Sequence, residues 1–158
     1  MRVRSRPAPA ATASQLSENV EMYLETIYEL TEQGGRARTK DVAHGWRVGP
    51  SSATEMIQRL AAAGLVEHEP YHGVELTRRG KALAKGVVRK HRLLECFLLQ
   101  DVGLEPKLAD EHACEMEHVL PAPVEAWFCR RLGHPTATPA GLPIPPGPCC
   151  RAAGKAQA

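Results

Sequence analysis

One predicted helix collects metal-binding side chains on a single face. At 100° per residue, five polar residues between positions 106 and 120 fall within about 60° of one line. They are Asp110, Glu111, Cys114, Glu117 and His118. The apolar residues of the segment take the other side, so one face packs while the opposite face carries a thiol, carboxylates and an imidazole. These are donor groups of a transition-metal site, and adjacent turns can aim Cys114, Glu117 and His118 at one ion.

Two earlier segments carry related groups. His91 and Glu95 show the i, i+4 spacing at the edge of an apolar stripe. Met22 falls nearly opposite the apolar stripe of the first predicted helix, where a surface methionine or a contact with another domain is an equally good interpretation. A surface or capping role is likewise open for His91 alone. Two such faces meeting across a helical hairpin would hold repelling carboxylates together unless a cation lies between them, so the groups jointly predict a metal site.

Hydrophobic periodicity and turn residues predict the elements that position these groups. Ser17 and Ser51 are expected N-caps, and Gly34 and Gly64 are expected to end the helices that those serines begin. The expected helices cover residues 18–33, 39–47, 51–63, 78–100, 106–120 and 123–132, and the expected strands cover 65–69 and 74–77. A helix, a turn, a second helix and a hairpin together predict a winged helix-turn-helix over residues 18–77.

Both ends of the chain differ in composition from its middle. Residues 1–17 are basic and rich in Ala and Pro without apolar periodicity, which predicts a disordered arm. Residues 134–158 are dominated by Pro and Gly, which predicts an unstructured tail. Residues 78–133 therefore form the expected second, helical domain.

Composition excludes several classes of protein. With 158 residues, 43% hydrophobic and 24% charged, the chain is neither collagenous, wholly disordered nor a membrane protein. It shows no secretory signal, which predicts a cytoplasmic protein. Its five cysteines, an odd number, predict reduced thiols that pack or bind metal.

Charge is distributed unevenly. Residues 77–92 contain seven basic residues and no acid, whereas residues 93–128 contain eight acids and Lys107. This asymmetry predicts a polyanion partner for the first stretch and a cation site or interface for the second, with solvated helix faces as the alternative. No phosphate-binding glycine loop, strand-borne nucleophile or HExxH motif is found, so we expect no enzyme.

Five passages, in this order, carry a resemblance to a known family. They are EMYLETIYEL (21–30), PSSATEMIQRL (50–60), GLVEHEPYHGVELTRRGKALA (64–84), VVRKHRLLECFL (87–98) and DEHACEMEHVL (110–120). Over residues 18–145 the chain resembles the metal-dependent repressors typified by the diphtheria toxin repressor, with the manganese transport regulators as shorter relatives. The resemblance implies a mainly α fold, an N-terminal winged helix-turn-helix followed by an α-helical metal-binding and dimerisation domain.

The resemblance also implies a ligand set. Met22, Cys114, Glu117 and His118 match the family's activating site, and His91 and Glu95 match part of its ancillary site. Asp110 stands where iron-type members have a histidine, and Glu25 matches a ligand of manganese-type members. Because Met and Cys sulfur favours metals softer than manganese, we expect Fe(II), with Mn(II) as the alternative cofactor.

The family's DNA-reading helix corresponds to residues 51–63. The expected DNA contacts are Thr39, Lys40, Ser51, Ser52, Thr54, Glu55 and Arg59. Glu55 departs from the family pattern because it repels phosphate, although it can accept from a cytosine amino group. Gly45 and Trp46 are also unusual, since glycine weakens a short helix and Trp46 replaces a smaller leucine.

The end of the chain departs most from the family. GLPIP (141–145) resembles the joint that leads into a third β domain in iron-type members, yet thirteen residues follow it, so we expect that domain to be absent. Dimer contacts are expected from apolar residues of the last two helices, namely Leu120, Val124, Trp127 and Phe128.

The resulting hypothesis is a regulator, with two alternatives. We expect a homodimeric repressor of metal-uptake genes that binds a palindromic double-stranded DNA operator when metal is bound, without membrane contact. A metal-independent winged-helix regulator is the first alternative, and a small metalloenzyme is the second.

Overall fold

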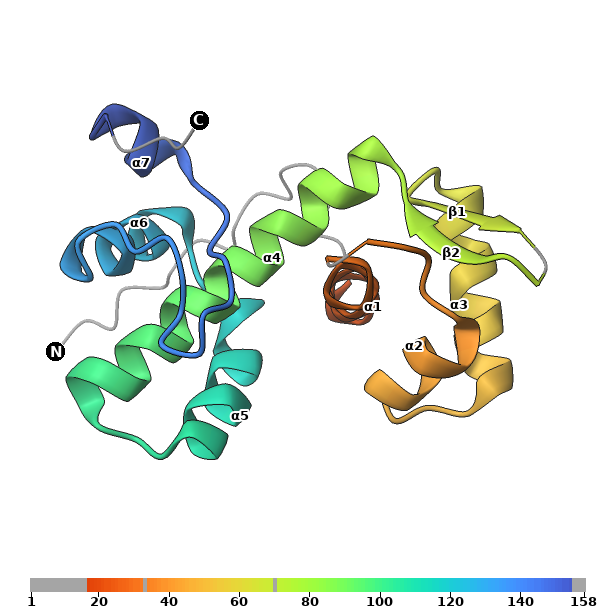
Figure 1. Cartoon of the computed structure of the whole chain (residues 1–158), viewed down its shortest axis with the longest axis horizontal. Coiled ribbons are helices and arrows are strands. Elements are labelled where there is room, and N and C mark those ends of the chain that lie inside the picture. Colours follow the sequence, from red (N-terminus) through yellow and green to blue (C-terminus); the bar gives the residue numbers. More distant parts are fainter. Residues whose placement is uncertain (1–16, 33, 70, 155–158) are drawn as a thin grey trace, which may run out of the picture.

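Two helical bodies are joined by one long helix (Figure 1). The computed structural model describes residues 17–32, 34–69 and 71–154, so nearly all of the expected basic arm lies outside the described residues. The elements are α1 (Glu18–Thr31), α2 (Thr39–Gly45), α3 (Pro50–Ala62), β1 (Val66–Glu69), β2 (Gly73–Leu76), α4 (Arg78–Phe97), η1 (Leu98–Val102), α5 (Pro106–Glu117), α6 (Ala122–Arg131) and α7 (Pro148–Ala152). None of the described helices has the length and apolar character needed to cross a bilayer.

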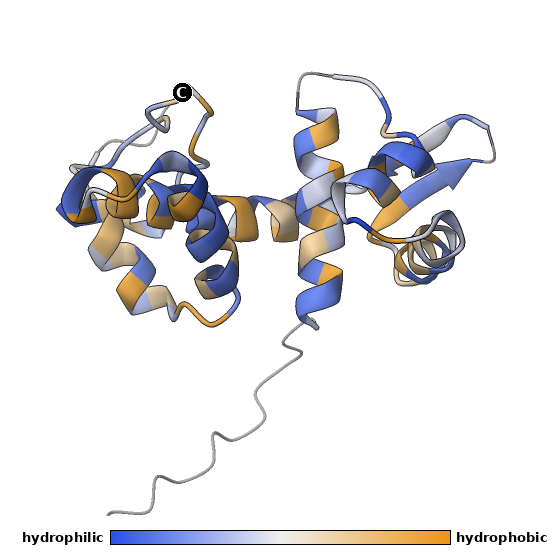
Figure 2. Cartoon of the chain, turned by 90° about the horizontal axis from the view of Figure 1, so that it is seen from below, coloured by the Kyte–Doolittle hydropathy of each residue, from blue (hydrophilic) through white to orange (hydrophobic). Residues whose placement is uncertain are grey.

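The N-terminal body is the predicted winged helix-turn-helix. Strands β1 and β2 pair antiparallel, with Val66 opposite Leu76 and Glu69 opposite Gly73. Its core consists of the apolar stripes of α1, α2 and α3 packed on the hairpin and the start of α4 (Figure 2). The most deeply buried members are Leu24, Ile27, Val42, Ala53, Ile57, Val74, Ala84 and Val88. The period of 3.6 read from the sequence thus predicted the packed faces correctly.

A backbone contact sets the direction in which α4 leaves the hairpin. A Cβ atom on Gly80 would overlap the carbonyl oxygen of Leu65, so only glycine lets the first turn of α4 lie directly on the chain entering β1. Thr77 is the N-cap of α4, because its hydroxyl accepts from Gly80 N at 3.1 Å and donates to Gly64 O at 2.8 Å. The sequence predicted the helix but not this joint.

The C-terminal body packs α5 and α6 against the second half of α4. Its core contains Leu94, Leu98, Ala109, Ala113, Leu120 and Phe128. The long helix was expected to continue to about Gln100, but α4 ends at Phe97 and the chain continues as one π-helical stretch, η1, to Val102. Gly103 follows with φ 79°, a left-handed conformation that ends the helix.

Of the two serines expected to cap helices, only Ser17 lies at an N-cap position. Ser17 occupies the N-cap position of α1, and its carbonyl oxygen accepts from Val20 N and Glu21 N. Ser51 does not cap α3, because that helix begins one residue earlier, at Pro50, with Gly49 as N-cap. Proline suits the first helical position because its missing N–H would have no partner there.

The expectation of an unstructured tail is wrong for residues 134–154. Ile144 and Cys150 are buried against Leu93 and Cys96 of α4, and α7 follows. Proline and glycine disfavour regular helix and sheet, but an extended segment can still lie on a surface when donors satisfy its carbonyl oxygens. Arg89 and Arg92 of α4 supply such donors.

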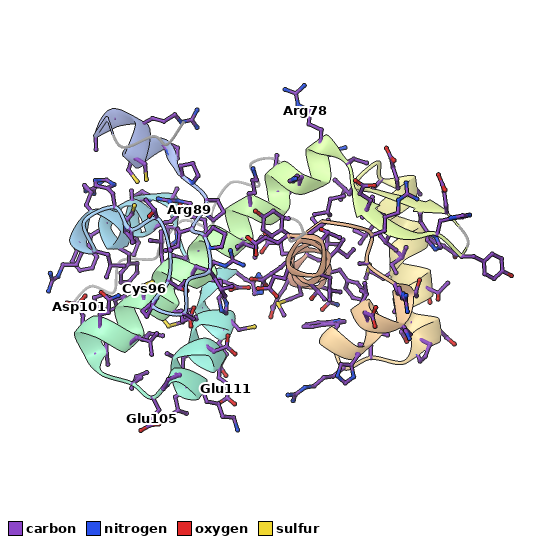
Figure 3. The ribbon with its side chains drawn as sticks, viewed as in Figure 1. Arg78, Arg89, Cys96, Asp101, Glu105 and Glu111 are labelled. Carbon is purple, nitrogen blue, oxygen red and sulfur yellow. The ribbon has the colours of Figure 1, made fainter. Side chains whose placement is uncertain are left out.

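The basic stretch of residues 77–92 is only partly a free surface. Arg78 points away from the protein at the start of α4, whereas Arg89 points towards the C-terminal segment (Figure 3). Arg89 donates to Glu125 Oε1 at 2.6 Å and to Pro145 O at 2.7 Å. Arg92 donates to both carboxylate oxygens of Glu32, at 2.9 and 2.8 Å, and to Pro143 O. Part of the charge that suggested a polyanion partner therefore holds the chain together internally.

Candidate metal centre and DNA-reading surface

A fully buried carboxylate lies at the centre of the predicted metal ligands. Glu117, in the last turn of α5, is 0% exposed. Its Oε2 lies 2.7 Å from His91 Nδ1, and its Oε1 lies 3.2 Å from His118 Nε2. The second contact lacks hydrogen-bond geometry, so within the described residues Oε1 has no hydrogen-bond partner. A buried acceptor in this state needs a partner, and a cation is one.

The first group of donors joins α1 to the end of α5. Met22 Sδ lies 3.0 Å from His118 Nε2 and 3.8 Å from Cys114 Sγ. Met22 is therefore neither a free surface residue nor a core residue, and the position that looked unsuitable for packing lies against the candidate ligands. The group combines a thioether, a thiol, an imidazole and the Glu117 carboxylate.

Glu21 supports this group and was not among the expected site residues. Its Oε2 lies 2.7 Å from His118 Nδ1, the ring nitrogen that faces away from Met22. A carboxylate on the second nitrogen of a metal-binding histidine fixes the ring and its tautomer. The signal available in the sequence was the i, i+4 pair of Glu21 and Glu25 beside Met22, which spacing alone does not distinguish from a solvated helix face.

The second group lies on the other side of Glu117. Carboxylate oxygens of Glu25 and Glu117 and a ring nitrogen of His91 all lie within 4.8 Å of one another. His91 Nε2 also lies 3.2 Å from Asp110 Oδ1, although Asp110 is exposed. Glu95 is half-buried and interacts electrostatically with His91 and Asp110, without the close approach seen for the other four.

Protons stabilise these clustered groups in the absence of a cation. Burial, followed by the charge of Glu117, raises the pKa of Glu25 to about 9. Burial lowers the pKa of His91, but its hydrogen bond to Glu117 and the charges of Glu117, Glu25 and Asp110 outweigh burial and raise it to about 9. Burial and the charges of Glu117 and Glu25 raise the pKa of the Cys114 thiol to about 12. At neutral pH all three groups therefore carry their proton.

The residues fit a divalent cation. The unpartnered Oε1 of buried Glu117 and the crowding of carboxylates around His91 are what a site for a positive ion requires. Met22, Cys114, Glu117 and His118 would hold one ion, and Glu25, His91 and Glu117, with Asp110 nearby, would hold a second. Sulfur in the first set and oxygen with imidazole in the second make the two sets chemically different.

Apparent metal affinity is expected to rise with pH between about 6 and 9. Fe(II) or Mn(II) must displace the protons of Glu25 and His91, whose pKa values are both raised, so lower pH favours the metal-free form. Each displaced proton changes affinity by up to about tenfold per pH unit. Titration calorimetry at pH 6.5 and 8.0, in buffers of different ionisation enthalpy, gives the number of protons released. Equal affinity at both pH values with no proton release would contradict this expectation, and Glu25→Gln should release one proton fewer.

The expected DNA contacts lie on two parts of the N-terminal body. Lys40, Ser51, Ser52, Glu55 and Arg59 are exposed on α2 and α3. Thr39 is half-buried at the start of α2 and lines a hollow shared with hairpin residues, including His68 and Tyr71. Thr54 is less available, because its hydroxyl donates to Pro50 O at 2.9 Å. Tyr71, which was not among the expected contacts, is fully exposed at the hairpin turn with φ 68°.

The unusual Gly45–Trp46 pair is explained by packing against α1. A Cβ on Gly45 would lie 2.9 Å from Thr26 Cγ2, so glycine allows α2 to approach α1 closely. The Trp46 ring makes an edge contact with Tyr23, with centroids 6.0 Å apart. The Trp46 ring thus packs on the same helix, α1, that Gly45 allows to lie close to α2.

The expected dimer residues divide into two pairs. Leu120 and Phe128 are buried in the chain's own core, so they are not free to contact a partner as expected. Val124 and Trp127 remain exposed on α6, together with Met116 and Val119 near the end of α5. Exposed apolar side chains of this kind suit a protein interface.

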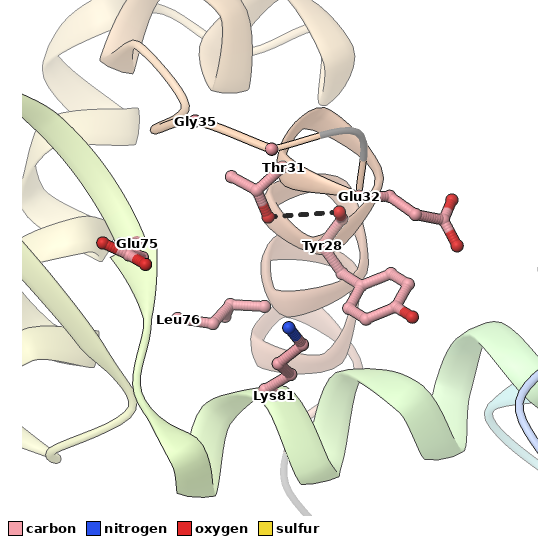
Figure 4. A pocket seen from close by; sticks show the side chains of 8 residues that line it. Tyr28, Thr31, Glu32, Gly35, Glu75, Leu76 and Lys81 are labelled. Atoms are coloured by element: carbon pink, nitrogen blue, oxygen red, sulfur yellow. Dashed lines mark hydrogen bonds between the residues drawn. The ribbon is translucent and has the colours of Figure 1, made fainter. Parts of the chain in front are cut away.

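A separate hollow lies between α1, β2 and α4 (Figure 4). It is lined by Tyr28, Thr31, Glu32, Gly34, Gly35, Glu75, Leu76 and Lys81. Within α1, which forms one side of the hollow, Thr31 Oγ1 donates to Tyr28 O at 3.2 Å. Its polar groups do not converge as those around Glu117 do, so the candidate site remains at Glu117.

Two protein-family profiles match consecutive parts of this chain. The profile described as the iron-dependent repressor N-terminal DNA-binding domain matches residues 15–74. The profile described as the iron-dependent repressor metal-binding and dimerisation domain matches residues 77–146. This chain belongs to the iron-dependent repressor family. The candidate centre straddles the two matched domains, since Met22 and Glu25 come from the first and the other ligands come from the second.

Individual members of the iron-dependent repressor family are similar over most of the chain. The iron-dependent repressor IdeR of Mycobacterium tuberculosis is 36% identical over 132 residues, which are 84% of this chain and 57% of that protein. The diphtheria toxin repressor of Corynebacterium efficiens is 37% identical, covering 82% of this chain and 56% of that protein. The chain therefore spans somewhat more than half the length of these relatives.

A solved structure agrees with the fold. A manganese-dependent transcriptional repressor in complex with manganese matches with a TM-score of 0.73 and 35% identity, covering 82% of this chain and 59% of that one. The predicted fold class is thus confirmed, and both iron- and manganese-dependent regulators are among the relatives. These relatives are transcriptional repressors and not enzymes, in agreement with the sequence analysis.

Proposed function

We propose that this chain is a metal-dependent transcriptional repressor that binds a palindromic DNA operator as a homodimer in its metal-bound form. One observation carries the proposal: Met22, on a helix of the DNA-binding body, lies against Cys114 of α5 and His118, which directly follows α5. Groups from two bodies thus converge on one point. A bound divalent cation supplies the positive charge that holds these donors together.

The residues around the centre control how the two bodies are oriented. Without metal, the Glu25 and His91 protons balance the charge, and the Met22 thioether, a weak acceptor, is held only by its contacts with His118 and Cys114. We infer that α1 and the DNA-binding body then sample several orientations. With Met22 and Glu25 held against α5, two α3 helices of a dimer can keep the separation of about 34 Å that successive major grooves require.

Iron is the proposed metal, with manganese as the alternative. Sulfur from Met22 and Cys114 favours Fe(II) over Mn(II), whereas the oxygen-rich set around Glu25 and His91 accepts either. The proposed partners are double-stranded DNA, bound through α2 and α3, and a second copy, bound through Val124 and Trp127. We propose that the protein acts in the cytoplasm on metal-uptake genes and does not contact membranes.

The test begins with the duplex itself, because operators cannot be transferred from relatives when Glu55 departs from the family. A random DNA library is selected with the full chain plus anaerobic Fe(II) or Mn(II). The affinity of the selected duplex is then measured by fluorescence anisotropy with each ion and with chelator. Metal should raise the affinity, and Cys114→Ala and His118→Ala should remove this increase while the dimer remains intact by light scattering.

The alternatives give different results. Equal DNA affinity with chelator and with metal would show a metal-independent winged-helix regulator. Turnover of a substrate by the metal-loaded chain, lost in a Glu117 variant, would show a metalloenzyme. Metal stimulation that survives both Cys114→Ala and His118→Ala would contradict the proposed centre.

A further inference from the structure

A second cluster of metal-binding groups lies at the other end of the molecule. Ligand atoms of Cys129, His134, Cys149 and Cys150 all lie within 4.8 Å of one another. Cys129 Sγ is 3.6 Å from Cys150 Sγ and 3.4 Å from His134 Nδ1. These residues come from the end of α6, the turn after it, and α7. In Figure 3 sulfur atoms, drawn in yellow, lie between α6 and α7.

This cluster is separate from the centre at Glu117. His91 of α4 faces that centre, whereas Arg89 and Leu93, each two residues away and therefore about 200° around the helix, face the C-terminal segment. Cys149 and Cys150 also follow residue 146, where the match to the iron-dependent repressor domain ends. The family's metal-binding domain therefore does not account for the cluster.

The spacing of the four groups suits tetrahedral zinc. With Zn–S near 2.3 Å and Zn–N near 2.0–2.1 Å, tetrahedral angles place two sulfurs about 3.8 Å apart and a sulfur and a nitrogen about 3.5 Å apart. The observed separations of 3.6 and 3.4 Å are close to these values. A disulfide needs about 2.05 Å between sulfurs, so Cys129 and Cys150, as described, are free thiols.

The backbone at the end of α6 brings His134 back to Cys129. Gly133 and His134 both have positive φ, at 74° and 59°, and His134 N donates to Cys129 O at 2.7 Å. A left-handed conformation is uncommon for a residue other than glycine. This conformation directs the His134 imidazole back towards the end of α6 and places its Nδ1 beside the Cys129 sulfur.

A buried arginine supports the cysteine pair. Arg89 Nη2 donates to Cys149 Sγ at 3.3 Å, while Arg89 also holds Glu125 and Pro145 O. A Cβ on Gly147 would overlap this guanidinium, so the glycine lets α7 begin directly over it. A cationic hydrogen-bond donor beside a thiolate is the kind of support that metal-bound sulfurs receive in proteins.

We propose that Cys129, His134, Cys149 and Cys150 bind one zinc ion in a closed structural site. Three thiolates and an imidazole form a complete ligand set for zinc and are softer than Fe(II) or Mn(II) prefer. The site holds residues 134–150 on α4 and α6. That segment buries few apolar side chains of its own, chiefly Ile144 and Cys150, so a metal cross-link provides stability that packing does not.

The zinc content of the full chain tests this proposal independently of the proposed regulatory function. The chain is purified under reducing conditions with zinc, dialysed, and measured by inductively coupled plasma mass spectrometry and native mass spectrometry. A variant with Cys114→Ser, Glu117→Gln and His118→Ala, which lacks donors of both groups at the Glu117 centre, should keep one zinc per chain. Adding Cys149→Ser and Cys150→Ser to that background should remove it, with circular dichroism confirming that the helices remain.

Two further measurements keep the test decisive if the cysteine variants fold poorly. In the same Cys114→Ser, Glu117→Gln and His118→Ala background, Co(II) should produce the intense visible absorption of tetrahedral thiolate-bound cobalt. His134 is half-buried, so His134→Gln leaves the core intact. It should weaken zinc binding by more than the about 10–100-fold that loss of a supporting hydrogen bond costs.

Four results would overturn the proposal. The first is a folded Cys114→Ser, Glu117→Gln and His118→Ala variant that contains no zinc. The second is a zinc ion that survives loss of both Cys149 and Cys150. The third is Co(II) absorption without thiolate character, and the fourth is a disulfide among the three cysteines in the reduced, zinc-exposed protein.

Discussion

Replacing Glu117 by glutamine is expected to abolish metal-stimulated DNA binding. Glu117 lies between the two groups of donors, 2.7 Å from His91 and 3.2 Å from His118, so this one change removes a ligand from both. If metal favours the DNA-competent arrangement tenfold at each protomer, a dimer loses about 100-fold in affinity, or roughly 2.7 kcal/mol. The affinity of the selected duplex, measured with and without Fe(II) or Mn(II), gives this value directly.

The glutamine keeps the shape of the side chain, so the variant separates metal binding from packing. Its amide can still satisfy one neighbour in the buried space, and the metal-free chain should therefore stay folded. Glu115→Gln is the matched control, because Glu115 lies on the same helix with an exposed carboxylate that pairs with His112. The control should retain full stimulation. Normal stimulation in Glu117→Gln would remove Glu117 from the proposed centre.

Removing the side chain of Arg92 is expected to cost the most stability. Arg92 is 1% exposed, and it donates twice to Glu32 after α1 and once to the carbonyl oxygen of Pro143. Arg92→Ala leaves the Glu32 carboxylate and that carbonyl without their partner. Breaking a buried pair in this way costs about 3–5 kcal/mol. Urea unfolding followed by circular dichroism, at one fixed protein concentration, measures the loss.

Two variants control for the loss of charge and of the side-chain stem. Arg78→Ala removes an exposed arginine from the same helix and should change stability by less than about 0.5 kcal/mol. Arg92→Lys keeps the charge but not the two parallel donors, and it should fall between Arg92→Ala and the unchanged chain. A loss below about 1 kcal/mol for Arg92→Ala would show that the pair is screened by solvent and does not hold α1 to α4.

The role of Glu117 could be predicted from the sequence, whereas the role of Arg92 could not. Glu117 was predictable because Cys114, three positions before it, and His118, directly after it, are also metal donors. Arg92 was not, because its partners lie 60 and 51 residues away. In the sequence it belonged to a basic stretch that suggested a polyanion partner. Charge counts do not show which charges the protein itself neutralises.

The same contrast holds at the C-terminal segment. Pro and Gly content predicted an unstructured tail, because composition describes local backbone preference and these residues favour neither helix nor strand. The segment is nevertheless packed, since Arg89 and Arg92 supply donors to its carbonyl oxygens and Ile144 fills a place on α4. Five cysteines were expected to pack or bind metal, but nothing in their spacing indicated that three of them meet His134.

The sequence alone determined the helical faces of the N-terminal body, the hairpin and the chemical types of the donors, because each depends on residues within a turn or two of one another. The expected packed face of α5 was wrong, since Leu108, Met116 and Val119 are exposed and Ala109 and Ala113 are buried. Tertiary structure decided that Glu117 serves two groups of donors, that Glu21 orients His118, and that Arg89 and Arg92 are internal. It also decided that a second cluster forms between α6 and α7. These outcomes depend on distances between residues far apart in the chain. Such distances are set by how the helices pack in three dimensions and not by local spacing.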